Sequence, residues 1–295
     1  MNASPELLRW RAAGETLSVR GQPIFYRLDG PPNAPPLVLI HGFPTASWDW
    51  HALWPALTAH YRVLAPDLLG LGFSAKPRAH DYTVAEQADL IEAIAAHVGM
   101  TDVRLVAHDY GDTVAQELLA RHDAGGPLRL RCLALRNGGL FPETHHARPI
   151  QKLLLGPLGP LIARLSGRRA FGRSFAAVLG AKTQPDEAEL DDFWYLIDHD
   201  GGRRVLHRLQ RYMIERRARR SRWVGALQTT RVPLLLTNGS ADPVSGAHMV
   251  ARYRELVVAA DVVELAGVGH YPQVEAPDRV LQACREFWRR IGALR

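Results

Sequence analysis

Residues Val103–Glu117 read VRLVAHDYGDTVAQE and carry the clearest structural signal in the chain. The stretch begins as an apolar strand, reaches Asp109 at a sharp turn, and continues as a helix from about Gly111. Small residues stand two positions on either side of the aspartate, because a strand-to-helix turn this tight brings neighbouring backbones close together. This is the spacing of a nucleophile elbow. The position that usually holds serine holds aspartate here.

A carboxylate at the elbow changes the expected chemistry. Serine must lose a proton before it attacks, whereas an aspartate with an ordinary pKa of about 3.9 is already ionised. We therefore expect Asp109 to attack a saturated carbon that bears a leaving group, forming an ester that an activated water then hydrolyses. Taken alone, the same residue could instead be the N-cap of a helix on a Rossmann-like sheet.

Composition places the chain among globular enzymes. Its 295 residues suffice for one α/β domain with a large insertion, and 47% are hydrophobic and 22% charged. No apolar run reaches the roughly 18 residues that span a bilayer, and the N-terminus lacks the pattern of a signal peptide. With only Cys132 and Cys284, we expect buried free thiols rather than a disulfide framework, and a cytoplasmic location.

The formal net charge of +6 arises from one segment. Residues 203–222 carry nine arginines against a single acid, Glu215. A basic segment of this kind can contact nucleic acid or an anionic membrane. Aromatic residues are not interleaved with the arginines, however, and no nucleic-acid-binding motif accompanies them. We interpret the segment as a solvent-facing helical surface with some intramolecular ion pairs, and expect no nucleic-acid partner.

Strand and helix signals alternate along the chain, which predicts an α/β fold with a mostly parallel central sheet and flanking helices. After an opening hairpin at 15–28, strands are expected at 36–40, 61–65, 103–107, 128–136, 232–237 and 261–265. Helices are expected at 84–98, from about 111 to 122, and at 278–291. Strand signals vanish between about 140 and 222. We therefore predict a core domain of 1–139 and 223–295, with a helical cap of 140–222 inserted after the sixth strand.

Two later loops supply the other groups that ester chemistry needs. The loop NGSADP at 238–243 presents Asp242, and the loop GVGHYP at 267–272 presents His270. Each follows an apolar strand, and open α/β sheets build their sites at the carboxyl ends of strands. We expect Asp242 to orient His270 and His270 to activate water. Either residue on its own could equally be structural.

The tetrapeptide His41-Gly-Phe-Pro44 directly follows the strand that ends at Ile40. Such a loop can aim the Phe43 N–H at the site, while the Tyr110 N–H comes from the elbow. Two backbone donors on one ester oxygen form an oxyanion hole, worth about 3 kcal/mol per donor. We also predict a cis peptide bond between Phe43 and Pro44.

These motifs together resemble a known superfamily. The strings HGFP at 41–44, DLLGLGFS at 67–74, HDYG at 108–111 and GHYP at 269–272 resemble the α/β-hydrolase branch that contains epoxide hydrolases and haloalkane dehalogenases. Longer strings resemble the epoxide-hydrolase-like subgroup related to the mesoderm-specific transcript protein, namely HDYGDTVAQELL at 108–119, NGGLFPETH at 137–145 and RWVGA at 222–226. The resemblance covers essentially the whole chain. It implies an α/β-hydrolase fold, a cap and the triad roles given above.

The resemblance leaves the leaving group open. Dehalogenases commonly place a tryptophan after the nucleophile and another N–H donor after His-Gly, but these positions hold Tyr110 and Phe43 here. This favours hydrolysis of a small apolar epoxide by water, with no metal and no cofactor. Dehalogenation by the same ester mechanism remains an alternative, as does a ligand-binding α/β-hydrolase with little turnover. A homodimer is also left open.

Epoxide hydrolases generally protonate the opening ring with two cap tyrosines, whose pKa of about 10 suits the task. The cap offers Tyr195 and Tyr212, and Tyr212 lies near the end of the insertion, where the second family tyrosine is expected. No tyrosine stands between Phe141 and Gln151, so His145 is the proposed second group. Either could instead be a packing or surface residue, and Tyr195 could replace one of them.

Three cap residues are expected to shape the substrate pocket, namely Trp194, Tyr195 and Leu153. Some relatives place the triad acid after the strand that ends near Asn137, but an amide cannot balance a developing imidazolium. That leaves Asp242 as the orienting acid. Asp112 falls in the first turn of the elbow helix, where we expect a structural role.

Overall fold

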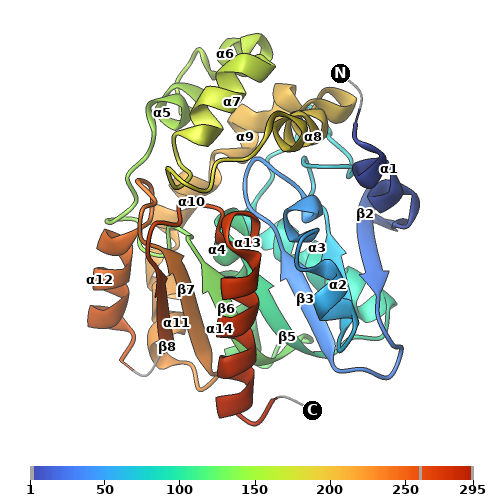
Figure 1. Ribbon diagram of the computed structural model, residues 1–295, viewed down its shortest axis with the longest axis vertical. Helices are drawn as coiled ribbons and strands as arrows, with labels where there is room; N and C mark the ends of the chain where they lie inside the picture. The colour runs from blue at the N-terminus through green and yellow to red at the C-terminus, as the bar shows by residue number, and fades with distance from the viewer. Residues whose placement is uncertain (1–2, 259–260, 294–295) are drawn as a thin grey trace.

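The computed structural model describes residues 3–258 and 261–293. Within these ranges, eight strands form one sheet in the order β1-β2-β4-β3-β5-β6-β7-β8 (Figure 1). β2 pairs antiparallel with β1 and β4, and all other neighbours are parallel, which confirms the predicted sheet. The strands are β1 (Glu15–Val19), β2 (Gln22–Asp29), β3 (Pro36–Ile40), β4 (Arg62–Pro66), β5 (Asp102–Ala107), β6 (Arg129–Arg136), β7 (Leu234–Gly239) and β8 (Asp261–Leu265).

Helices cover both faces of the sheet (Figure 1). Successive residues of a strand point to opposite faces, so Val38 belongs to one buried apolar cluster and Leu37 to the other. One face packs against α3, α4, α11 and α12, and the other against α1, α2 and α14. These helices are α1 (Pro5–Ala12), α2 (Trp54–Thr58), α3 (Val84–His97), α4 (Tyr110–Asp123), α11 (Arg220–Thr229), α12 (Ala247–Leu256) and α14 (Pro277–Arg290).

Local signals set the bounds of these elements. The Thr83 hydroxyl accepts from the Glu86 N–H at 3.2 Å and caps the start of α3, and Gly99, with a φ of 74°, follows its end. β7 begins two residues later than predicted, because Pro233 has no N–H to contribute to the sheet. The remaining predicted strands agree to within two residues.

The first helices between β6 and β7, from Pro149 to Leu209, lie beyond the carboxyl ends of the parallel strands, at the top of Figure 1. This confirms the predicted helical cap after the sixth strand. The segment contains α5 (Pro149–Leu155), α6 (Gly159–Leu165), α7 (Arg168–Ala176), α8 (Glu187–Asp198), η2 (His199–Val205), α9 (Leu206–Leu209) and α10 (Tyr212–Ala218) before α11.

The last helix of this segment joins the cap to the sheet domain. Arg222 and Trp223 of α11 donate to the Glu117 carboxylate of α4, at 2.7 and 2.8 Å. The predicted second boundary, after Arg222, therefore falls inside a helix that packs on the core. The division of the chain into core and cap at these positions stays a prediction.

The arginine-rich segment departs in part from the sequence interpretation. Some of its arginines form the expected ion pairs, namely Arg203 with Asp198, Arg220 with Glu143 and Arg222 with Glu117. Arg216, by contrast, is only 2% exposed. A solvent-facing position is therefore wrong for Arg216, because α10 turns this side chain inward beneath the cap.

The two cysteines, Cys132 and Cys284, are buried and unpaired, as predicted. The Cys284 sulfur accepts from the Arg136 guanidinium at 2.7 Å. Within the two described ranges, no helix combines the length and apolarity needed to cross a bilayer.

Candidate active site

Asp109 stands at the turn between β5 and α4 with a φ of 48° and a ψ of −107°, a sparsely populated backbone conformation. Gly111 makes this turn possible, since a Cβ there would lie 2.5 Å from the Ile40 carbonyl oxygen. The Asp109 side chain makes no capping hydrogen bond to α4. Asp109 therefore occupies the N-cap position without capping the helix through its side chain, and it lies in the wall of a cavity instead.

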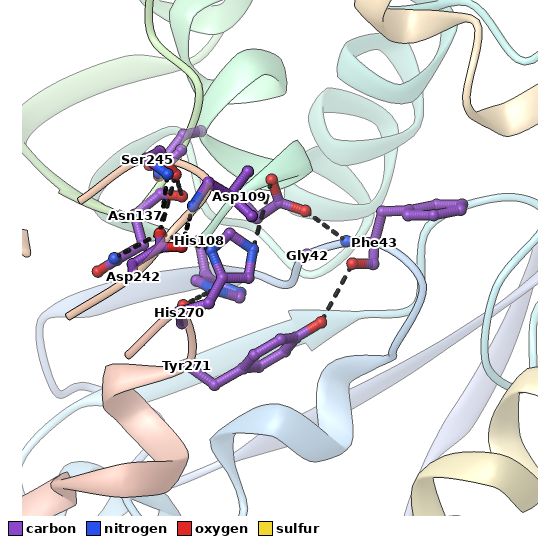
Figure 2. Close-up of polar contacts among 12 residues, drawn as sticks. Gly42, Phe43, His108, Asp109, Asn137, Asp242, Ser245, His270 and Tyr271 are labelled. Carbon is purple, nitrogen blue, oxygen red and sulfur yellow. Dashed lines mark hydrogen bonds and ion pairs between the residues drawn. The ribbon is translucent and has the colours of Figure 1, made fainter. Parts of the chain in front are cut away.

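Backbone and histidine groups surround the Asp109 carboxylate (Figure 2). The Phe43 N–H donates to Oδ2 at 3.2 Å, and His270 Nε2 lies 3.9 Å from Oδ1. The Phe43 loop is held in turn by Tyr271, whose hydroxyl donates to the Phe43 carbonyl at 3.1 Å. The predicted cis bond between Phe43 and Pro44 is present. The loop thus places a backbone donor against the carboxylate, where an ester carbonyl would form.

Asp242 holds the histidine. Its Oδ2 lies 2.8 Å from His270 Nδ1 and also accepts from Asn137 Nδ2 at 2.9 Å and from the Ser245 N–H and hydroxyl at 3.1 Å. The Val244 N–H donates to the other oxygen at 2.7 Å. Asn137 therefore supports the acid rather than replacing it. The sequence did not predict that Ser245 donates to Asp242, because nothing in NGSADP or the residues after it marks Ser245 as a donor to this carboxylate.

His108, next to Asp109, is a second group that the sequence analysis missed. Its ring is fully buried and its Nε2 lies 2.8 Å from the His270 carbonyl oxygen (Figure 2). Burial, together with the charge of His270, lowers the pKa of His108 to about 3. The neutral ring can donate through Nε2, and so ties the elbow to the loop that carries His270.

Burial and charge set the protonation states of the three central groups. Burial raises the pKa of Asp109, but His270 and His108 outweigh it and hold that pKa below its usual range. Asp242 is likewise held low, because His270 outweighs the effect of burial. For His270 burial lowers the pKa, yet the two carboxylates raise it well above its usual range. These shifts favour the charged forms of Asp109, Asp242 and His270.

A cavity opens over this group, enclosing about 940 Å³ of space that includes its mouth. Asp109, Phe43 and His270 lie in its wall. Cap helices supply most of the remaining lining, which is largely apolar: Leu154, Phe171, Phe175, Trp194, Ile197 and Leu206. A small apolar molecule in this cavity would meet the carboxylate at its polar end.

Residues 35–277 match a family described as "alpha/beta hydrolase fold". The chain belongs to the α/β-hydrolase family. It is 41% identical over 297 residues to the mesoderm-specific transcript homolog protein of Bos taurus, covering 96% of this chain and 88% of that one. It is also 41% identical over 281 residues to the putative hydrolase LipZ of Mycobacterium tuberculosis, covering 95% and 97%. The resemblance seen in the sequence is confirmed.

Solved structures share the fold of this α/β-hydrolase. A haloalkane dehalogenase loop variant, DbeA-M1 from Bradyrhizobium elkanii, has a TM-score of 0.79 at 24% identity and covers 95% of this chain and 97% of its own. The epoxide hydrolase CorEH has a TM-score of 0.75 at 20% identity, covering 94% and 99%. At these identities the likeness shows the fold alone.

Of the three residues expected to bind substrate in this α/β-hydrolase, the structure places only Trp194 in the cavity wall. Leu153 is 53% exposed, and its neighbour Leu154 lines the cavity instead. The half-buried Tyr195 packs near His199, with ring centroids 5.7 Å apart. This corrects the expectation for two positions. Successive residues point about 100° apart around a helix, and the sequence did not set the phase of α5 or α8.

The two proposed ring-opening groups of the α/β-hydrolase, Tyr212 and His145, lie close enough to Asp109 for its charge to act on both, although neither is among the residues that line the cavity. Tyr212 is fully buried, with its ring centroid 4.5 Å from that of Tyr110 and 6.2 Å from that of Phe43. Burial, and then the charge of Asp109, raise the pKa of Tyr212 above its usual range. Burial lowers the pKa of His145 to about 3, so its ring is neutral. Their roles stay predictions.

Proposed function

We propose that this α/β-hydrolase opens an epoxide to a vicinal diol through an ester on Asp109. One observation carries the proposal: the elbow presents a carboxylate, with the Phe43 N–H on one oxygen and His270 beside the other. A hydroxyl at this position would favour acyl transfer. A carboxylate favours attack on a saturated carbon, followed by hydrolysis of the product ester.

In the first step, an Asp109 oxygen attacks a ring carbon and the C–O bond of the epoxide breaks. The electron pair moves to the ring oxygen, which takes a proton from the Tyr212 hydroxyl while His145 donates a hydrogen bond. Tyr212 regains a proton through solvent from the imidazolium of His270, which leaves His270 neutral for the next step.

In the second step, His270 takes a proton from a water that attacks the ester carbonyl of Asp109. The Phe43 and Tyr110 N–H groups stabilise the oxyanion, which collapses and releases the diol. Asp109 raises the pKa of His270 only while it is charged. Ester formation removes that charge, so the pKa of His270 falls when a base is needed.

A panel of small apolar epoxides, assayed for diol, tests the proposal, with bromoalkanes assayed for halide release in parallel. Diol formation that is lost in Asp109→Ala is the expected result. Halide release without diol would contradict the proposal in favour of dehalogenation. Saturable binding of the compounds with no turnover would contradict it in favour of a ligand-binding α/β-hydrolase.

Tyr212→Phe is expected to slow ester formation by about 10²–10⁴-fold, the usual worth of a positioned acid. The Tyr212 hydroxyl has no hydrogen-bond partner among the described residues, so its removal should leave the Tm unchanged. Single-turnover kinetics with an epoxide measure the rate. Tyr195→Phe is the matched control, because the Tyr195 ring packs near His199. Equal rates for Tyr212→Phe and the native protein would show that another group supplies the proton.

The two steps should respond differently to pH. Asp109, with its lowered pKa, stays ionised from about pH 5 to 8, so ester formation should be flat across that range. His270 acts as a base only when neutral, so ester hydrolysis should slow as the pH falls through its pKa in the ester. We expect the ester to accumulate at the acid end, measured by acid quenching and mass spectrometry. Accumulation at the alkaline end instead would exclude His270 as the base.

A further inference from the structure

Arg216, in α10, is a buried cation that the mechanism above does not use. Its Nε and Nη2 donate to the Thr113 hydroxyl, at 3.2 and 2.7 Å. Thr113 stands one helical turn beyond Asp109 on α4, so the guanidinium is anchored to the nucleophile's own helix. Across residues 3–258 and 261–293 Arg216 forms no ion pair, unlike Arg222 of the next helix, and its Nη1 has no hydrogen-bond partner.

The free Nη1 faces other polar groups that also lack partners. A Cβ built on Gly139 would lie 2.1 Å from Arg216 Nη1 and 2.8 Å from His145 Nδ1, so both atoms border the space over this glycine. Both His145 nitrogens and the Tyr212 hydroxyl are buried without partners in the described structure. The guanidinium carbon lies 4.9 Å from the centroid of the Tyr212 ring. Buried donors are normally satisfied, so this cluster is poised for an acceptor.

The charges of Arg216 and Asp109 indicate what kind of acceptor this cluster can bind. Arg216 lowers the pKa of Asp109, after the larger effects of burial and the neighbouring histidines, so its charge acts on the nucleophile. When Asp109 attacks, its negative charge moves to the leaving atom. A fixed cation between α4 and the cap can compensate the carboxylate before the step and the departing anion after it.

We propose that Arg216 is a further catalytic residue, whose Nη1 donates to the oxygen that leaves the ring carbon together with His145 and Tyr212. The inference rests on the proposed function and narrows its substrates to cyclic ethers whose leaving group is an oxygen anion. The C–O bond to Asp109 forms, the ring C–O bond breaks, and the oxygen takes the Tyr212 proton. Arg216 stays protonated and stabilises the tyrosinate beside it until the proton from His270 reaches Tyr212 through solvent.

Arg216→Gln is expected to slow ester formation by about 10²–10³-fold, the effect of losing one oxyanion donor, and to leave ester hydrolysis unchanged. Arg217→Gln, exposed on the same helix, is the matched control and should slow neither step. If Arg216 had only a structural role, Arg216→Gln would lower the Tm and slow both steps together. That result would overturn the proposal. Arg216→Lys keeps the charge, and should retain the fold and part of the rate.

A second test does not depend on turnover. Asp109→Asn removes the carboxylate charge, so sodium formate should give a saturable rise in Tm at ionic strength matched with sodium gluconate. The rise should vanish in Asp109→Asn with Arg216→Gln, be reduced but present with Arg216→Lys, and persist with Arg217→Gln. No rise in Asp109→Asn, or an equal rise in all variants, would overturn the anion site. If formate binds through Arg216 but no epoxide yields diol, the proposed function fails while the site stands.

Discussion

Asp109→Ala should abolish diol formation, lowering kcat by about 10⁶-fold, as does loss of the nucleophile in triad hydrolases. The reason is chemical, because no other carboxylate lies in the cavity wall among the described residues. The Phe43 N–H would remain, but without an ester carbonyl to polarise. Steady-state turnover of an epoxide, with the variant's circular dichroism compared with that of the native protein, measures the effect.

Asp123→Ala is the matched control for this loss. Asp123 ends the same helix, exposed and remote from the cavity, and should retain native turnover. Residual activity of Asp109→Ala within about 10²-fold of native would mean that water attacks the epoxide directly. The ester mechanism would then be wrong, although the hydrolase assignment would remain.

His270→Ala should separate the two halves of the reaction. Ester formation needs only Asp109 and the cap groups, whereas ester hydrolysis loses its base and should slow by about 10⁴-fold. The variant should therefore consume one epoxide per active site and stop. Mass spectrometry should find the Asp109 peptide heavier by the mass of the substrate.

The control for the His270→Ala experiment is His97→Ala. His97 is an exposed histidine at the end of α3, and this variant should turn over normally. A double variant, His270→Ala with Asp109→Ala, should yield no modified peptide, which ties the label to the nucleophile. If the native protein forms diol while His270→Ala consumes no epoxide, His270 is required for ring opening. The proposed assignment of His270 to ester hydrolysis alone would then be wrong.

The grouping of Asp109, Asp242 and His270 could be predicted because it follows from topology. Each residue comes directly after a strand signal, and β5, β7 and β8 run parallel, so their carboxyl ends meet at one edge of the sheet. The structure brings His270 within 2.8 Å of Asp242 and 3.9 Å of Asp109. A short apolar run and the loop after it were enough to locate all three.

The orientation of Arg216 could not be predicted in this way. It is one of nine arginines in 20 residues, and only the helical phase distinguishes a buried arginine from an exposed one. That phase is reset several times, because Asp200 and Gly201 take positive φ angles inside η2 and short helices follow. For the same reason the sequence predicted Leu153 in the cavity wall, where the structure places Leu154. Short, interrupted helices conceal which side chains face inward.

The contact between Asn137 and Asp242 has a consequence for how such triads evolve. The two side chains sit at the ends of adjacent strands, β6 and β7, and share a hydrogen bond of 2.9 Å next to His270. A carboxylate introduced at Asn137 would meet Asp242 directly, and the pair would share one proton and keep one charge. A carboxylate can therefore be introduced at position 137, after β6, before Asp242 is lost from the loop after β7. With this geometry, Asn137→Asp followed by Asp242→Asn should keep a carboxylate beside His270 at each step.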